Sequence, residues 1–443
     1  MTPKPAHNKA RTETSAGGGG RDSSFSSRED TSLTRDSAFV TFENLDKVGE
    51  IAVYYGFAPM KSPAIVKTDL DAAKDILEGD YVDDETELHG RLPLHVEEKI
   101  ALIRTYQKEN MQNLPQPVMF YFKDPCRNAL KKGAYPRYAD LEILGSSGAI
   151  AEATLIQTAR AMLAFEGYAN TTVEINSVGD RDSITRFVRE LTAYYRKNLN
   201  EMTPECRQLF KTDPFELLST HEESCRMLNA AAPRALDFLT EISRRHLEEV
   251  LEYLEKLKIP YTLNNGLIGN RKYVTETIFT IINADADRKK AGEQTVLAVG
   301  VRYNGLSKRL NMKRDIQGVG ISLLVKEGKN GTRKPVSRIK RPIASFVQLG
   351  LESKLLSLQV IESLRQAKIP LHLSLAKDRL GAQVSSVEKY HTPYVIVMGK
   401  KEAVDRTAIV RRSDTHSQDI VPLDDLPKYM KKIEAQWLKK KTA

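Results

Sequence analysis

The segment FYFKDPCRNALKKGAYPRYADLEILGSSGAIAEATLI, Phe120–Ile156, holds two apolar runs followed by the start of a helical pattern. Residues 117–122 and 137–146 are rich in the aromatic and branched side chains that strands prefer. Residues 149–168 place apolar side chains at helical spacing. Two successive strands before one helix break the strict strand–helix alternation of a parallel sheet. We therefore predict an α+β fold with a mostly antiparallel sheet.

The rest of the chain divides by composition. Residues 1–35 are rich in Ser, Thr, Gly and Arg with almost no apolar side chains, which predicts a disordered arm. Residues 36–325 are expected to form the core, with a helical insertion, a long helix over 236–257 and a short strand at PAIVKT, 63–68. The polar, basic residues 326–342 are predicted to be a linker. Residues 343–443 alternate strands with helices, which predicts a small α/β domain with a largely parallel sheet.

Composition excludes several classes of protein. Of the 443 residues, 41% are hydrophobic and 28% charged, which is ordinary for a globular protein. We find no apolar run long enough to span a bilayer and no secretory signal, so we predict a cytoplasmic protein. The three cysteines, Cys126, Cys206 and Cys225, are odd in number, which fits a reducing compartment, and they form no metal motif. The net charge of +9 is compatible with a polyanionic partner such as RNA.

The order of these segments resembles that of histidyl-tRNA synthetases, which are class II aminoacyl-tRNA synthetases. YYGFAPMKSP (54–63) resembles the first class motif, the opening segment resembles the second, and GVGISLLV (318–325) stands at the third. LIGNRKYVTETIF (267–279) and VGVRYNGL (299–306) stand where the family has its two histidine signatures. The resemblance implies an antiparallel-sheet catalytic core, a C-terminal anticodon-binding-like domain, a homodimer, and tRNA as partner. If the protein is active, ATP and Mg²⁺ are implied as well.

In this family an arginine of the second motif grips the α-phosphate of ATP, and an acid nearby helps to hold the nucleotide. Arg127 stands at the place of that arginine, but Ala129 replaces the acid. Arg137, at the far end of the loop, is a second candidate for phosphate binding. Both arginines could instead cap a solvated hairpin.

The other arginine positions of the family are changed. The third motif ends in Lys326 and Glu327, where the resemblance implies an acid–arginine pair. In the first histidine signature Gly269 stands in place of the arginine that acts on the reacting groups, and Lys272 in place of an acid. Tyr273 keeps one aromatic side chain. Arg271 lies two residues along an expected strand, so it would share a face with position 269 and is the candidate replacement.

Other substrate-binding positions are better kept. GVRYNGL (300–306) retains Arg302 and Tyr303, both candidates for substrate binding, and Tyr303 could border a pocket or be a core aromatic on a strand. The family recognises histidine partly through a helical Arg-Pro-Glu-x-Thr, which here reads HVEEK (95–99). Only Glu97 matches, and Lys99 takes the place of the threonine. Glu97 is the candidate partner of an α-amino group, although a glutamate on a solvated helix face is the more ordinary interpretation.

Basic side chains in the linker and the last domain are candidate contacts for RNA phosphates. The candidates are Lys334, Arg338, Lys340, Arg341, Arg411 and Arg412. Because the changes at Ala129, Gly269, Lys272 and Glu327 fall at separate catalytic positions, we predict an impaired paralogue that binds tRNA or a protein partner. The alternatives are an active histidine–tRNA ligase with substituted residues, and a regulatory subunit of histidine biosynthesis. The anticodon-binding-like domain counts against the regulatory subunit.

Overall fold

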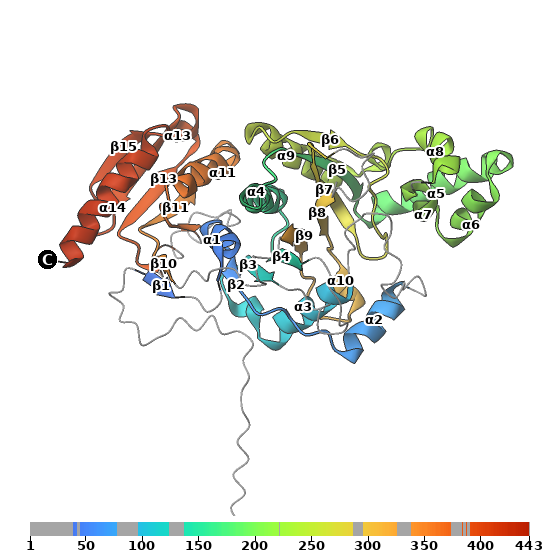
Figure 1. Cartoon of the computed structure of the whole chain (residues 1–443), viewed down its shortest axis with the longest axis horizontal. Coiled ribbons are helices and arrows are strands. Elements are labelled where there is room, and N and C mark those ends of the chain that lie inside the picture. The colour runs from blue at the N-terminus through green and yellow to red at the C-terminus, as the bar shows by residue number, and fades with distance from the viewer. Residues whose placement is uncertain are drawn as a thin grey trace, which may run out of the picture.

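The structure is a computed structural model that describes residues 39–41, 45–77, 96–123, 137–220, 222–286, 296–325, 338–373, 383, 387 and 390–442. An eight-stranded sheet forms the centre of the molecule (Figure 1). Its strands in spatial order are β2 (Ala58–Pro59), β3 (Val118–Lys123), β4 (Arg137–Leu144), β9 (Gly318–Val325), β8 (Val296–Arg302), β7 (Thr275–Asn283), β5 (Thr171–Gly179) and β6 (Tyr261–Leu263). Only the outermost pairs, β2–β3 and β5–β6, are parallel. The prediction of an α+β fold with a mostly antiparallel sheet is confirmed.

Each face of this sheet buries a different set of side chains. On β4, Leu141 and Ile143 belong to one hydrophobic cluster together with Ile321 of β9. This first face is covered by α4 (Ile150–Phe165) and α9 (Glu241–Lys256). The second face is covered by α3 (Val96–Lys108), whose Ile100 and Ile103 pack with Phe120 and Tyr303. Because strand residues alternate, the intervening Asp140 and Glu142 of β4 face α3.

The remaining core helices flank the sheet. They are α1 (Lys47–Tyr54), α2 (Lys67–Leu77) and α10 (Leu306–Arg309). A helical insertion of α5 (Arg181–Lys197), α6 (Pro204–Thr212), α7 (Pro214–Ser219) and α8 (Glu223–Ala230) follows β5 and projects from the side of the molecule opposite the C-terminal domain (Figure 1). The helices that we expected in this part of the chain begin at ordinary caps: the side chain of Asp180 accepts the backbone N–H of Ser183 at the start of α5, and Thr240 accepts that of Ser243 at the start of α9.

The C-terminal domain contains a five-stranded sheet, and the helices named below are those of its described residues. Its strand order is β12 (Leu371–Leu373), β11 (Ala344–Gln348), β13 (Tyr394–Met398), β14 (Thr407–Arg412) and β15 (Gln418–Pro422). The helices are α11 (Leu351–Gln366), α13 (Lys400–Val404) and α14 (Leu426–Thr442). Both pairings of β11 are parallel, whereas β13–β14 and β14–β15 are antiparallel. The prediction of a largely parallel sheet was wrong because β14 and β15 form an antiparallel hairpin, and β15 was not predicted.

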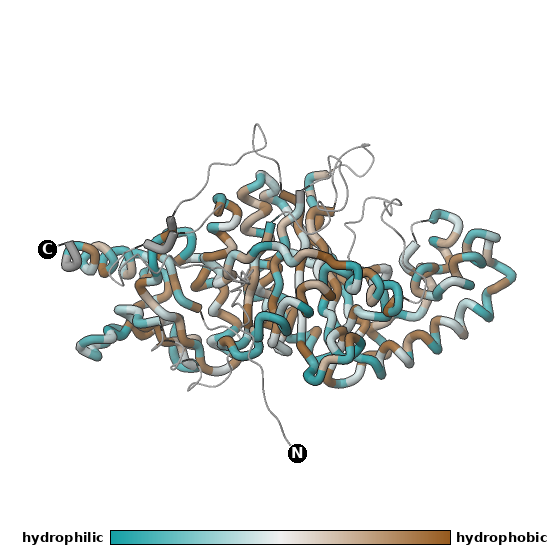
Figure 2. The backbone as a smooth tube through the Cα atoms, turned by 90° about the horizontal axis from the view of Figure 1, so that it is seen from below, coloured by the Kyte–Doolittle hydropathy of each residue, from teal (hydrophilic) through white to brown (hydrophobic). Residues whose placement is uncertain are grey.

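The two domains share one continuous hydrophobic cluster, which contains Val48 of α1 as well as Leu358 of α11. At this contact the hydroxyl of Tyr55 donates to Glu362, and the guanidinium of Arg365 lies 5.9 Å from the centre of the Tyr55 ring. Figure 2 shows hydrophobic and hydrophilic residues alternating along the outer helices, as expected where one side of a helix is buried.

Three local predictions differ from the structure. PAIVKT forms no strand, because the chain runs extended after β2 and enters α2 at Lys67. The end of the expected linker is β10 (Arg338–Lys340), which pairs antiparallel with β1 (Phe39–Thr41). Cys206 and Cys225 are joined by a disulfide between α6 and α8, which the odd number of cysteines did not suggest. The arm 1–35 and most of the linker lie outside the described residues.

Candidate functional site

The face of the central sheet beneath α3 carries a buried ionic cluster, which we call the Lys99 cluster: Lys99, Asp140, Glu142, Tyr303 and Ser322. The ammonium of Lys99 donates to one carboxylate oxygen of Glu142. The hydroxyl of Tyr303 donates to the other oxygen at 2.6 Å. The side chains of Lys99 and Glu142 are 5% and 1% exposed, so both charges are removed from solvent. The Lys99 ammonium also lies 5.8 Å from the centre of the Tyr303 ring.

Asp140 is a buried carboxyl group of the cluster with a shifted pKa. Asp140 accepts a hydrogen bond from the hydroxyl of Ser322, its neighbour across the β4–β9 pair. Burial, followed by the charge of Glu98, raises the pKa of Asp140 to about 7. Burial alone would lower the pKa of Lys99, but the carboxylates of Glu142 and Asp140 outweigh it and the pKa is raised. Lys99 is therefore a cation held by buried acids.

Two glycines of β9 make room for this cluster. A side chain at Gly320 would overlap the carboxylate of Glu142, and one at Gly318 would overlap the Tyr303 ring. These are the glycines that the third motif retains. Here they allow Glu142 and Tyr303 to lie flat over the strand, so the space above β9 is filled by side chains of the protein itself.

Arg302 and Tyr303 point to opposite faces of the sheet. Arg302 is fully buried on the face covered by α4, where two of its nitrogens donate to Glu152 at 2.7 and 2.6 Å. A third nitrogen donates to the carbonyl of Ser146 at 2.8 Å. Both were candidates for substrate binding, but strand alternation places the two side chains on opposite faces. Arg302 therefore links β8 to α4 through its ion pair with Glu152.

Glu152 gathers two further partners on that face. Its Oε1 accepts from the hydroxyl of Thr277 at 2.7 Å and lies 2.9 Å from Nε2 of His246. Burial opposes ionisation, but the charges of Arg302 and His246 hold the pKa of Glu152 well below its usual range. The two hydrogen bonds from Arg302 and the contacts with Thr277 and His246 together provide polar partners for the fully buried carboxylate of Glu152.

The first histidine signature folds differently from the sequence expectation. Strand β7 begins at Thr275, so Arg271 lies in a turn and the argument from a shared strand face was wrong. The side chain of Arg271 donates to Asp213 of the helical insertion at 2.6 Å. Lys272 donates to the carbonyl of Leu77 at 2.6 Å. Gly269 has φ +58°, a left-handed conformation in which an arginine would be strained.

The remaining candidates fall into two groups. Glu97 is buried on α3, and burial followed by the charges of Glu97 and Glu98 raises the pKa of Tyr273. Glu97, Tyr273 and Tyr303 therefore lie on the same side of the sheet as the Lys99 cluster. Arg137 is the first residue of β4, and its backbone pairs with Val325. Arg127 and Ala129 lie outside the described residues.

The basic residues proposed for RNA are spread over the C-terminal domain and its approach. Lys340 donates to Glu434 of α14 at 2.7 Å, and Arg412 donates to Asp414 at 2.6 Å. Arg411 is exposed, Arg341 is half-buried, and Arg338 begins β10. Lys334 lies outside the described residues. Among the candidates whose side chains are described, Lys340 and Arg341 lie at and after β10, and Arg411 and Arg412 lie on β14.

Sequence reasoning missed Asp140, Glu142 and Glu152. The signal was present in the letters ADLEI, where acids alternate with apolar residues in an otherwise apolar strand. Acids at such positions are buried and need partners. Within the described ranges, no group of three or more His, Cys, Asp or Glu side chains is arranged to hold a metal ion. No helix among those residues is long and apolar enough to cross a membrane.

Comparison with known proteins gives consistent matches along the chain. The histidine–tRNA ligase of Symbiobacterium thermophilum is 26% identical over 406 residues, which cover 87% of this chain and 92% of that protein. The histidine–tRNA ligase of Macrococcus caseolyticus is 23% identical over 397 residues, covering 87% and 94%. Residues 351–433 match the anticodon binding domain family.

Over most of its length the chain is therefore similar to histidine–tRNA ligases. A crystal structure of the apo histidyl-tRNA synthetase of S. aureus is also similar, with 22% identity, coverage of 87% of this chain and 94% of that chain, and a TM-score of 0.47.

Proposed function

We propose that this protein is a catalytically impaired histidyl-tRNA synthetase paralogue that binds tRNA, or a protein partner, as a cytoplasmic homodimer. The observation that carries the proposal is the position of the Lys99 ammonium, which is buried against Glu142 on the helix expected to recognise histidine. An amino-acid substrate brings its own cationic group. In this protein, Lys99 already supplies the cation that the buried acids require.

Displacing Lys99 would be costly. Breaking a buried ion pair by removing one partner costs about 3–5 kcal/mol. The interactions of a bound histidine would have to exceed this cost before the amino acid bound with any net affinity. Exclusion of the substrate is therefore an energetic consequence of the Lys99 cluster as well as a steric one.

The loss of arginines supports the same proposal. Amino-acid activation relies on cations placed where negative charge develops, and removing one such donor typically costs about 2.7–4 kcal/mol of transition-state stabilisation. Position 269 is a glycine in a left-handed conformation, and Arg271 is engaged by Asp213. In our proposal Arg271 therefore holds the helical insertion and makes little contribution to adenylation.

We propose that residues 36–325 form the synthetase-like core and residues 343–443 the RNA-binding domain, joined by the basic segment 326–342. The match of residues 351–433 to the anticodon binding domain supports the RNA-binding part. Because one hydrophobic cluster runs through both domains, they are expected to hold tRNA as a single body.

The second candidate function is an active histidine–tRNA ligase, with Arg127, Arg137 and Arg271 acting on ATP and Glu97, Tyr273 and Tyr303 on histidine. It is favoured by the grouping of the last three on one face. ATP and Mg²⁺ belong to this alternative. Asp140 and Glu142 are the carboxylates of the cluster, and Lys99 already supplies their counter-charge, so they do not fit an Mg²⁺ site while Lys99 is in place.

Equilibrium binding on one preparation tests the proposal. Calorimetric titration with L-histidine, alone and with ATP and Mg²⁺, is expected to show no binding in the range where the Symbiobacterium thermophilum ligase binds. A tRNA transcript with a histidine anticodon is expected to shift this protein in a gel at moderate salt. Histidine binding comparable to that of the control ligase would overturn the impairment, and absence of any tRNA complex would overturn the RNA-binding part.

A further inference from the structure

Helix α14, the last element of the C-terminal domain, has one buried and one exposed side. Leu426, Met430 and Ile433 are buried in the shared core. Lys431 and Lys432 follow Lys428 by three and four residues, so the three lysines lie together on the opposite, exposed side of the helix. We call these three residues the α14 lysine stripe. The exposed Lys439 continues it, since seven residues are about two helical turns.

The stripe has almost no acidic compensation on its own helix. The one acidic residue of α14 is Glu434, which is buried and accepts a hydrogen bond from Lys340 at 2.7 Å. Within the described part of the chain, Lys428, Lys431 and Lys432 form no ion pair. Their charges are therefore open to a ligand, whereas Lys340 and Arg412 are already paired.

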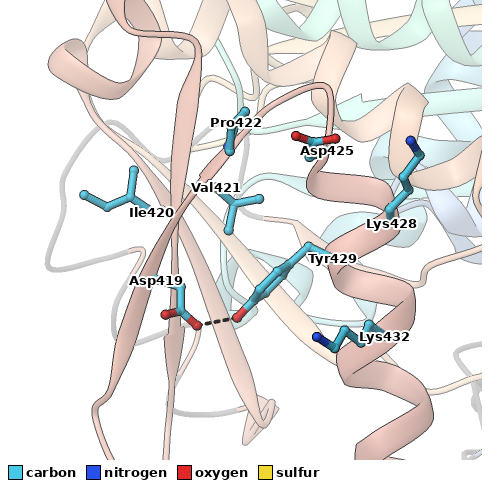
Figure 3. Close-up of a pocket in the computed structure, with 8 residues that line it drawn as sticks. All are labelled: Asp419, Ile420, Val421, Pro422, Asp425, Lys428, Tyr429 and Lys432. Atoms are coloured by element: carbon cyan, nitrogen blue, oxygen red, sulfur yellow. Dashed lines mark hydrogen bonds between the residues drawn. The ribbon is translucent and has the colours of Figure 1, made fainter.

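Next to the stripe, α14 and β15 enclose a shallow groove of about 540 Å³. Figure 3 shows Tyr429 crossing the groove to Asp419 of β15, with Lys428 and Lys432 on either side of it along α14. Asp419 is engaged by the Tyr429 hydroxyl, and Asp425 lies at the start of the helix beside Lys428. Ile420, Val421 and Pro422 supply apolar lining on the β15 side of the groove, and Lys428 and Lys432 lie along its α14 side.

We infer that the α14 lysine stripe binds the phosphate backbone of RNA, an inference that rests on the proposed tRNA-binding function. Lysines act as point charges towards phosphates and do not select bases, so the stripe would contribute affinity and not sequence choice. A lipid surface fits less well. An interfacial helix must offer an apolar face to the bilayer, and the apolar face of α14 is buried in the domain.

The stripe differs from the basic residues that sequence reasoning selected. Lys334, Arg338, Lys340 and Arg341 precede the domain, and Arg411 and Arg412 lie on β14. The match to the anticodon binding domain ends at residue 433, while α14 continues to Thr442. Lys439 therefore lies beyond the residues that this family match covers.

The test compares two triple variants of the full chain. Lys428→Gln/Lys431→Gln/Lys432→Gln removes the stripe. Lys368→Gln/Lys400→Gln/Lys401→Gln removes three exposed lysines elsewhere on the same domain and gives the same net charge. All six positions are exposed, so both variants are expected to keep the thermal midpoint of the wild type. Dissociation constants for the tRNA transcript are measured from 50 to 300 mM salt.

We expect the stripe variant to bind roughly 10- to 100-fold more weakly at physiological salt, with the slope of log K against log salt reduced by about 2–3. The control variant is expected to change affinity less than threefold. Equal losses of tRNA affinity in the two variants would overturn the claim that the α14 lysine stripe binds RNA, while leaving the tRNA-binding proposal in place. A wild-type protein that does not bind the transcript at all would overturn both.

Discussion

Replacing Lys99 by alanine is the most informative single change in the protein. It removes the buried ammonium and leaves Glu142 with the Tyr303 hydroxyl as its remaining partner at 2.6 Å. Loss of one member of a buried ion pair costs about 3–5 kcal/mol. The side chains of Lys99 and Glu142 are 5% and 1% exposed, so solvent cannot compensate for this loss. We expect a fall of several degrees in the thermal midpoint at pH 8.

A small cation should reverse part of this loss. Removing the Lys99 side chain leaves a cavity whose acidic end once held an ammonium group, and methylammonium carries the same group. A ligand that binds only the folded state stabilises it by RT ln(1 + [L]/Kd), which for a Kd of about 10 mM gives about 1.4 kcal/mol at a ligand concentration of about 100 mM.

The assay is thermal unfolding in methylammonium chloride and in sodium chloride of equal ionic strength, for the Lys99→Ala variant and for the wild type. Lys108→Ala on the same helix removes an exposed lysine and serves as the control. Only the Lys99 variant should gain stability specifically from methylammonium. An unchanged midpoint in Lys99→Ala, or equal responses to the two salts, would refute the account of Lys99 as the buried counter-ion.

Four further predictions follow from the other buried groups. The pKa of Asp140 is raised to about 7, above its unfolded value, so the folded protein should lose stability as the pH rises from about 4 to about 7. The loss should reach about 4 kcal/mol, and Asp140→Asn should remove it. Urea titrations across this pH range measure both. Arg302→Met should destabilise the protein by about 3–5 kcal/mol, because Glu152 would remain buried without its main cation. A small effect on the thermal midpoint would contradict a stabilising role of the Arg302–Glu152 ion pair. Gly269→Arg restores the family's residue in sequence but should lower stability by about 1–3 kcal/mol and add no adenylation, because position 269 has φ +58°. Cys206→Ser should lower the free energy of unfolding by about 3 kcal/mol, because it removes a disulfide with a sequence separation of 19. Dithiothreitol should destabilise the wild type but not this variant.

Much of the fold was predictable, because the aromatic and branched side chains of β3 and β4 and the helical spacing in α3, α4 and α9 are local signals. The cluster beneath α3 was not, since the letters do not give the strand register. Glu142 meets Lys99 only because β4 pairs with β9 so that Glu142 lies opposite Gly320. Arg302, a candidate for substrate binding, lies on the other face because adjacent residues of a strand point apart. Arg271 was misplaced because a turn with a positive φ at Gly269 replaced the expected strand.

Histidine-dependent exchange of pyrophosphate into ATP tests the central claim most directly. The wild-type protein, shown to be folded by its thermal transition, is assayed beside the Symbiobacterium thermophilum ligase with saturating histidine, ATP and Mg²⁺. Because Lys99 occupies the acids of the pocket and position 269 has no arginine, we predict no exchange above the histidine-free background. Histidine-dependent exchange within about tenfold of the control ligase would contradict the account, and would make Arg127 and Arg271 the next residues to replace.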